Sequence, residues 1–239
     1  MIRDKEDSLE VGRKYKGDRC VVYDMGHGKI DPKTGKYVTA PSKMFRHERF
    51  DMHNNGWFYE GVKNRMYGEL ISKHLRDAGV VVRYPHHNWK DTPLSDRINF
   101  TNFIHTNIQK CMFVSQHSNA TSGHNARGYS VWTSKGQTTS DVLAEKLMLK
   151  YQTTFVNVDN TRRIRTLTDA RRDGDLDYEA NFRVLAETYC PAVLIENLFF
   201  DEIHDALLLM NKQYMIQYCK MEANWIIDCL EYLDEKDNK

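Results

Sequence analysis

Short apolar runs alternate with longer segments of helical periodicity along this chain. The runs that predict strands are 20–24, 80–84, 112–116, 129–133 and 192–196. Between the first two, apolar residues recur at mostly three- and four-residue intervals over 58–79, which predicts a helix with Glu60 in its first turn. Similar patterns predict helices over 94–107, 140–155 and 214–233. Such alternation is typical of a largely parallel sheet covered by helices, so we expect an α/β fold.

Length and composition narrow the range of functions. The 239 residues suffice for a single α/β domain, and nothing in the sequence demands a second one. With 34 basic and 33 acidic residues, the chain has no strong net charge, so we expect no nucleic-acid partner. No apolar run reaches about 18 residues, and the N-terminus has no apolar core of a signal peptide. We therefore expect no membrane insertion and synthesis in the cytoplasm without a signal peptide.

The five cysteines are odd in number and widely spaced, without a CxxC pair. They are Cys20, Cys111, Cys190, Cys219 and Cys229. This spacing argues against a disulfide framework. We expect reduced, mostly buried thiols that contribute to core packing rather than to thiol chemistry.

Polar side chains with catalytic potential follow three of the predicted strands. His27 stands between Gly26 and Gly28 after the first strand, the strand 112–116 runs into His117, and the strand 192–196 ends on Glu196. The carboxyl ends of parallel strands deliver their residues to a common crevice. With Glu60 at its helix start, this set offers two imidazoles and two carboxylates.

This set suits a catalytic zinc ion. Zinc takes imidazole nitrogen and carboxylate oxygen, and a catalytic site uses three protein ligands. A further carboxylate then accepts a proton from the activated water, a role that fits Glu196. The residues alone leave alternatives open, because Glu60 could simply favour the helix N-terminus and Glu48 could replace it as a ligand. Ligands separated by dozens of residues are also less specific than a compact motif.

Four ordered motifs give the chain a family resemblance. "DMGHG", "EGVKN" with Glu60, "SQHSNA" and "PAVLIEN" resemble the motifs of zinc-dependent N-acetylmuramoyl-L-alanine amidases of the Amidase_3 type. The resemblance extends from about Val21 to the last helix. It implies a single-domain α/β fold with a six-stranded, mostly parallel twisted sheet flanked by helices. It also implies a Zn²⁺ site of His27, Glu60 and His117, with Glu196 as the catalytic carboxylate.

The activity implied by the resemblance is hydrolysis of peptidoglycan. The bond would be the amide between the lactyl group of N-acetylmuramic acid and L-alanine of the stem peptide. We expect residues 1–17 to form an N-terminal extension and residues 18–235 the catalytic domain, acting as a monomer. A phage or prophage endolysin that reaches the cell wall after release would fit, as would a bacterial amidase exported by another route.

Other residues depart from the family pattern or offer further chemistry. Asn197 replaces a usual Gly and could alter the mouth of the site, and the polar segment 29–58 could border a glycan groove or be a solvated loop. Arginines 162, 163 and 171 could bind substrate carboxylates, although a solvated loop is the better interpretation. A group of histidines is expected at the surface without a second metal site: His47, His53, His86, His87 and His124. His74 and His105 fall on predicted helices and are expected to pack or hydrogen-bond.

Two alternative functions remain at this stage. A zinc amidohydrolase or peptidase could act on another amide, because zinc chemistry alone does not select the substrate. A catalytically dead wall-binding module would lack a ligand or the base, whereas all four candidate residues are present.

Overall fold

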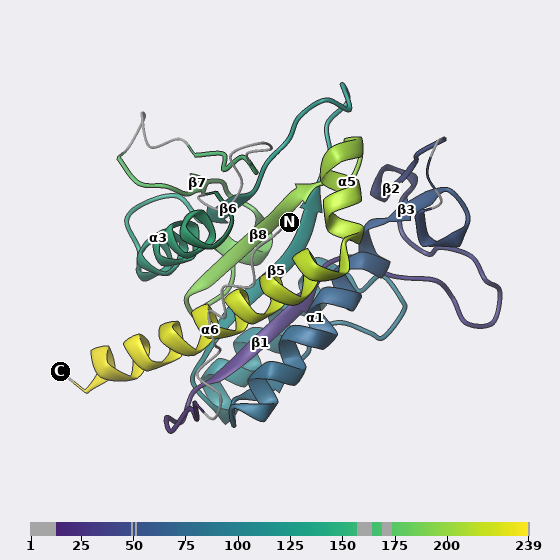
Figure 1. The fold of residues 1–239 in the computed structure, drawn as a ribbon. Helices are drawn as coiled ribbons and strands as arrows, with labels where there is room; N and C mark the ends of the chain where they lie inside the picture. The colour runs from purple at the N-terminus through teal and green to yellow at the C-terminus, as the bar shows by residue number, and fades with distance from the viewer. Residues whose placement is uncertain (1–12, 49, 51, 157–163, 169–173, 239) are drawn as a thin grey trace.

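A six-stranded sheet forms the centre of the computed structural model, which describes residues 13–48, 50, 52–156, 164–168 and 174–238 (Figure 1). The strands are β1 Cys20–Met25, β4 Val81–Arg83, β5 Cys111–Asn119, β6 Ser130–Thr133, β7 Tyr178–Glu179 and β8 Ala192–Phe199. Their order is β4-β1-β5-β8-β6-β7, and only the β6–β8 pair is antiparallel. The predicted single-domain α/β fold with a mostly parallel sheet is confirmed.

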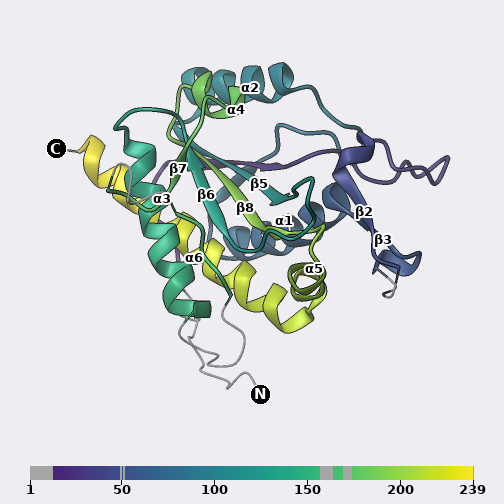
Figure 2. The ribbon, with the colours of Figure 1, turned by 90° about the horizontal axis from the view of Figure 1, so that it is seen from above.

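Helices cover both faces of this sheet (Figure 2). One face carries α1 Glu60–Asp77, α3 Thr139–Tyr151, α5 Ile203–Met210 and α6 Lys212–Asp237, and the other carries α2 Leu94–Phe103 and α4 Arg183–Ala186. Because both faces are covered, the central strands are apolar on both sides, and all six residues of β1 are buried. A small antiparallel hairpin of β2 Met44–Arg46 and β3 Trp57–Tyr59 lies beside the main sheet.

Short helical turns complete the described fold. The 3₁₀ turns η1 Pro41–Lys43 and η2 Met52–Asn54 flank the strand β2. The π-helical turns η3 Ile104–Ile108 and η4 Gln152–Val156 follow α2 and α3 directly. The helices predicted over 94–107 and 140–155 therefore exist, but each changes from α to π geometry in its last turn.

The prediction that strands end at or just before His117 and Glu196 is wrong. Both residues lie within strands, since β5 continues to Asn119 and β8 to Phe199. The β5–β8 pairing crosses an irregularity between His117 and Asn119, and Leu198 there has a positive φ of 64°. Backbone pairing therefore continues where the apolar pattern stops, and a β-bulge bends the sheet beside the two polar residues.

The buried interior agrees with the other predictions about packing. All five cysteines are free and buried. In α6, Tyr214, Tyr218 and Trp225 are buried in the core, as expected for this helix. None of the described helices has the length and apolar character needed to span a bilayer.

The described part of the N-terminal segment packs against the helices. Arg13 lies 2.6 Å from the carboxylate of Asp228 in α6. The backbone N–H of Tyr15 donates to the carbonyl of Ala78, just after α1, at 2.8 Å. Residues 1–12 of the expected N-terminal extension lie outside the described residues.

Candidate active site

His27 is held in a tight turn directly after β1. Its backbone has a positive φ of 64°, a conformation that is uncommon outside glycine. A Cβ atom on the preceding Gly26 would come within 2.2 Å of the His117 ring, and one on Gly61 within 1.8 Å of the Gly28 carbonyl oxygen. These glycines therefore allow the turn, β5 and the start of α1 to approach one another closely.

Glu60, the first residue of α1, brings the two histidines together. Its Oε1 lies 3.0 Å from His117 Nδ1 and 3.3 Å from His27 Nε2. The backbone N–H of Ser118 also donates to this oxygen, at 3.3 Å. One ligand atom from each of His27, Glu60 and His117 lies within 4.8 Å of the others, so the three residues form a compact N, O, N donor set.

Glu196 lies beside this donor set. It is the register partner of His117 on the neighbouring strand, so the two side chains leave the same face of the sheet. Its Oε2 is buried and makes no hydrogen bond among the described residues, and the same is true of His27 Nε2 and Glu60 Oε2. Buried polar atoms are normally paired, so three orphaned atoms in one place indicate a site for a cation and a polar ligand.

The two carboxylates have opposite pKa shifts. Burial opposes ionisation of Glu60, but the neighbouring imidazoles of His27 and His117, together with the charge of Lys43, outweigh it and hold the pKa of Glu60 well below its usual range. Burial, reinforced by the charge of Glu60, raises the pKa of Glu196 well above that of an ordinary carboxyl. Burial likewise lowers the pKa of His117, which favours the neutral imidazole that metal ligation requires.

The segment 29–58 contacts the site. Its composition alone did not decide whether it borders the site or is a solvated loop. Lys43 Nζ lies 3.6 Å from Glu60 Oε2, and its charge partly offsets the raised pKa of Glu196. Thr39 Oγ1 accepts the backbone N–H of Gly28 at 2.8 Å, and the Tyr37 hydroxyl accepts that of Gly61 at 3.0 Å. Sequence reasoning missed Lys43, since no motif or periodicity connects it with the site.

A buried polar network supports the strand that leads to His27. The carboxylate of Asp24 in β1 pairs with the guanidinium of Arg97 and accepts from the Ser115 hydroxyl at 2.9 Å. Burial opposes ionisation, but Arg97 dominates and lowers the pKa of Asp24. His86 Nδ1 accepts the backbone N–H of Met25 at 3.2 Å. The network fixes the end of β1 immediately before the turn.

Several other predictions about the site need correction. Glu48 is exposed and lies outside the donor set, so Glu60 is the better ligand candidate. Asn197 does not shape the mouth of the site, because it is buried and accepts a hydrogen bond of 2.7 Å from the Tyr214 hydroxyl of α6. Alternation along β8 points it to the face opposite Glu196. Arg162, Arg163 and Arg171 lie outside the described residues.

The histidines expected at the surface divide into two groups. His87 is exposed, and the His124 side chain is half-exposed and lies 2.8 Å from Asp201. His47 is buried, contrary to prediction, with its Nε2 2.9 Å from the Phe200 carbonyl oxygen, and His53 and His86 are half-buried. Hydrogen bonds to backbone groups explain why these three polar rings are tolerated away from solvent.

Comparison with known proteins decides the family. The sequence pattern of Amidase_3, described as N-acetylmuramoyl-L-alanine amidase, matches residues 21–228. The chain belongs to the Amidase_3 family. It is therefore a peptidoglycan amidase, a hydrolase that degrades the cell wall. A search of curated protein sequences found no match.

Solved structures share the Amidase_3 fold. The N-acetylmuramoyl-L-alanine amidase of Clostridium difficile 630 is 24% identical with a TM-score of 0.65, over 92% of this chain and 100% of that one. AmiC2 of Nostoc punctiforme is 20% identical with a TM-score of 0.65, over 90% and 99%. The catalytic domain of the CD27L endolysin, which targets Clostridia difficile, is 18% identical with a TM-score of 0.55, over 89% and 98%.

Proposed function

We propose that residues 18–235 form a zinc-dependent catalytic domain in which His27, Glu60 and His117 hold the metal and Glu196 transfers protons. The observation that carries this proposal is the buried N, O, N donor set with orphaned polar atoms at His27, Glu60 and Glu196. Two imidazoles and one carboxylate are a ligand set that catalytic zinc uses, with one position left for water. Zinc dependence is also typical of the family.

When bound, zinc would supply a Lewis acid that polarises the scissile carbonyl and lowers the pKa of water towards about 7. Glu196 acts as the general base: its carboxylate takes the proton from the attacking water. It then returns this proton to the leaving nitrogen of L-alanine. The raised pKa of Glu196 suits this role, because it makes the carboxylate a stronger base than an ordinary carboxylate.

The chain's other residues position these groups. The Ser118 N–H and the His117 ring hold Glu60 Oε1, and Lys43 supplies positive charge beside Glu60 Oε2. The scissile bond is the amide between the lactyl carbonyl of N-acetylmuramic acid and L-alanine. The tight turn at His27 leaves this end of the sheet accessible, since both histidine side chains keep 16–18% of their surface exposed.

The biological setting that we favour is a phage or prophage endolysin acting as a monomer on the wall after release. Its support is the likeness in fold to the catalytic domain of the CD27L endolysin. A bacterial amidase that reaches the wall by another export route is the alternative, and its support is the likeness in fold to the amidases of Clostridium difficile and Nostoc punctiforme.

Digestion of purified sacculi with zinc-loaded protein tests the proposal. We expect new L-alanine amino groups on the stem peptides and intact glycan strands, identified by mass spectrometry. New reducing ends without new amino groups would exclude the amidase mechanism. Cleavage inside the stem peptide would favour a peptidase, and no cleavage with metal bound would favour a wall-binding module.

A further inference from the structure

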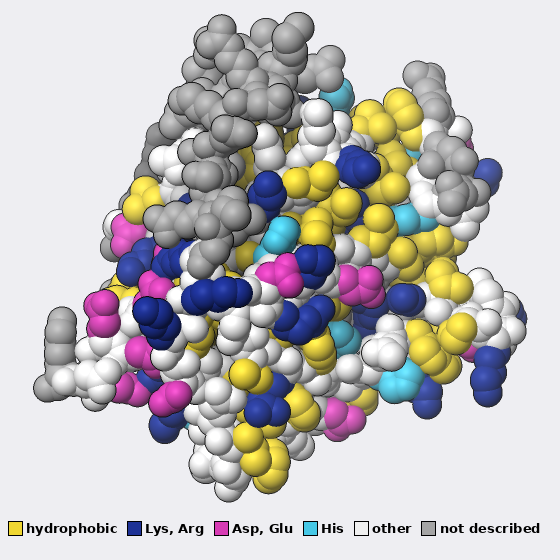
Figure 3. Space-filling model, turned by 60° about the horizontal axis from the view of Figure 1, so that its bottom comes forward, with side chains coloured by type: hydrophobic (Ala, Val, Ile, Leu, Met, Phe, Trp, Pro, Cys, Tyr) yellow, Lys and Arg dark blue, Asp and Glu magenta, His cyan; other side chains and the backbone are white. Residues whose placement is uncertain are grey.

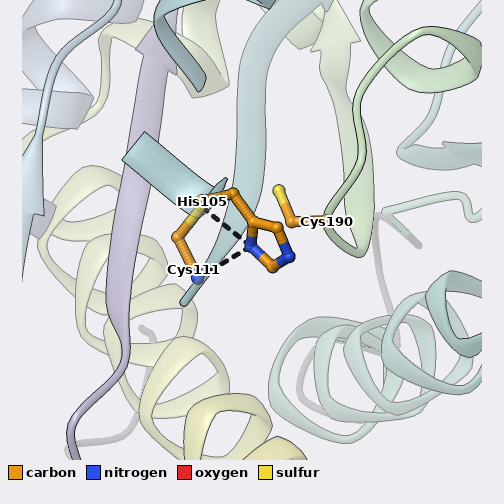
Figure 4. A group of neighbouring side chains, drawn as sticks. All are labelled: His105, Cys111 and Cys190. Carbon is orange, nitrogen blue, oxygen red and sulfur yellow. Dashed lines mark hydrogen bonds between the residues drawn. The ribbon is translucent and has the colours of Figure 1, made fainter. Parts of the chain in front are cut away.

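A second cluster of potential metal ligands lies at the other end of the sheet (Figure 4). His105 belongs to η3, Cys111 is the first residue of β5, and Cys190 precedes β8 by two residues. One ligand atom from each lies within 4.8 Å of the others. Both thiols are buried under the face covered by α2 and α4, and the imidazole is partly exposed.

The contacts within the cluster orient its sulfur and nitrogen atoms toward one another. His105 Nδ1 accepts the backbone N–H of Cys111 at 3.2 Å and lies 3.6 Å from Cys111 Sγ. The register pair Phe113 and Ala192 places Cys111 opposite Cys190 at the start of neighbouring strands. In a tetrahedral zinc site, Zn–S bonds of about 2.3 Å and Zn–N bonds of about 2.0 Å put ligand atoms about 3.5–3.8 Å apart. Side-chain rotations that move the ligand atoms by about 1 Å therefore suffice to bring them to these separations.

Cys20 lies beside this cluster without belonging to it. It is the register partner of Cys111 on β1, and both thiols are buried. A thiol on the neighbouring strand is placed to donate to the sulfur of Cys111 when that sulfur is a thiolate. Hydrogen bonds from neighbouring groups commonly orient metal ligands in this way.

A surface cavity gives access to His105 and is lined by positive charge. Its volume is about 190 Å³, and its lining includes Arg19, Lys110, Lys236 and Asp237. Lys and Arg side chains gather on the face that Figure 3 brings forward, with Asp and Glu among them. The cavity therefore connects the imidazole of the cluster with the surface.

The cluster is separate from the amidase site. Cys111 precedes His117 by six residues in the same strand, which at about 3.3 Å per residue puts them about 20 Å apart. The two groups therefore share no ligand.

We propose that His105, Cys111 and Cys190 form a second metal site, specific for a thiophilic divalent cation of the zinc class. Binding displaces the two thiol protons, so a dication is neutralised by two thiolates and a neutral imidazole. Because the site joins η3 and the start of β5 to the segment before β8, a bound ion cross-links two parts of the chain that are far apart in the sequence, and it stabilises the folded state.

Titration of the reduced, metal-free chain with Co²⁺ tests this site separately from the amidase site. Cobalt bound to thiolate produces a sulfur-to-metal charge-transfer band in the near ultraviolet, whereas His27, Glu60 and His117 offer no sulfur. We expect two Co²⁺ per chain and this band in the wild type. Cys111→Ser and Cys190→Ser should lose the band and one Co²⁺, and His105→Gln should weaken binding at this site at least about tenfold.

Two control variants distinguish a specific loss of Co²⁺ binding at the second site from misfolding of the chain. His117→Ala should lose one Co²⁺ and keep the sulfur band, and Cys229→Ala, which removes a buried thiol in α6, should keep both. Two results would overturn the second site. One is a wild type that binds Co²⁺ without a sulfur band. The other is a Cys111–Cys190 disulfide found by mass spectrometry in protein prepared under reducing conditions. Either result leaves the amidase proposal intact, because that proposal depends on sacculus cleavage.

Discussion

At the scale of single residues, the sequence predicted the members of the site better than their surroundings. His27, Glu60 and His117 meet as the motifs implied, because each motif combines a ligand with the glycines or strand that position it. Lys43 was not predicted, since it reaches Glu60 only through the path of the hairpin segment. A contact made by tertiary folding alone leaves no periodic or spacing signal in one sequence.

Gly26→Ala tests the close approach of the turn to β5. The new Cβ would lie 2.2 Å from the His117 ring, so this ring must move. Displacing a catalytic group by about 1 Å can cost about 10²-fold in rate, and we expect a loss of this order in kcat. Gly123→Ala is the matched control, because its Cβ would meet only the Asn125 side chain, at 3.1 Å. Equal activity of Gly26→Ala and wild type would contradict the geometry described for the site.

Lys43→Met tests the role of the Lys43 charge, which the sequence analysis did not predict. Removing this charge leaves the negative charge of Glu60 less compensated and raises the pKa of Glu196 further, since Lys43 lowers it in the wild type. A base must be deprotonated, so the acid limb of the kcat/KM profile should move to higher pH. The exposed Lys36 in the same segment provides the control, and Lys36→Met should leave the profile unchanged. A shift to lower pH in Lys43→Met would contradict the assigned electrostatics.

At the scale of elements, apolar patterns predicted the strands and helices but not where they end. The polar residues Ser115 and Gln116 interrupt the apolar run of β5, yet they still pair in register with Leu194 and Ile195 of β8. Strand pairing depends on partners far away in the sequence, which a local pattern does not contain. The bulge at Leu198 and the turn to π geometry after Phe103 were unpredictable for the same reason.

Tyr214→Phe tests the contact of α6 with the strand that carries Glu196. The Tyr214 hydroxyl donates to Asn197 Oδ1 at 2.7 Å and lies 3.0 Å from the Tyr151 hydroxyl, all in the buried interior. Losing it leaves a buried amide oxygen unpaired, which costs about 1–3 kcal/mol of unfolding free energy. Urea denaturation should show this loss. Tyr232→Phe, at a half-buried position of the same helix, should change stability by less than about 0.5 kcal/mol, and equal effects would argue against a specific role of the Asn197 contact.

At the scale of the whole molecule, the alternation of strands and helices predicted the α/β class and the dominant parallel pairing. It did not predict that β6 runs antiparallel to β8 or that β7 forms an edge, because strand order depends on crossover connections. The resulting sheet places His27 directly after β1 and brings His117 and Glu196, in the second halves of β5 and β8, next to Glu60 at the start of α1. The second cluster, His105, Cys111 and Cys190, lies at the amino ends of β5 and β8 and in η3.

Glu222→Gln tests how burial of charge in the core affects stability. Burial raises the pKa of Glu222 to about 7 from 4.5, although hydrogen bonds from Tyr23 and Tyr218 oppose the shift. Between these values the unfolded state has lost the proton that the folded state keeps, so stability falls as pH rises from about 4.5 to about 7. A difference of 2.5 pKa units corresponds to about 3 kcal/mol.

Denaturation at pH 5 and pH 8 measures this effect as a difference between variant and wild type. Glu222→Gln should gain stability relative to wild type on going from pH 5 to pH 8. Glu235→Gln, at an exposed position of the same helix, should show no such gain. A pH-independent difference for Glu222→Gln would show that Glu222 titrates alike in the folded and unfolded chains.

The central claim assigns proton transfer to Glu196 and metal binding to Glu60. The most direct test measures the zinc content and the rate of sacculus cleavage on the same sample of Glu196→Gln. The amide keeps the size of the side chain but accepts no proton from water. We therefore expect wild-type zinc content with a rate at least about 10²-fold lower, while Glu60→Gln loses metal and activity together. If Glu196→Gln instead sheds zinc while Glu60→Gln keeps zinc and full activity, the roles of the two carboxylates are reversed and the account is contradicted.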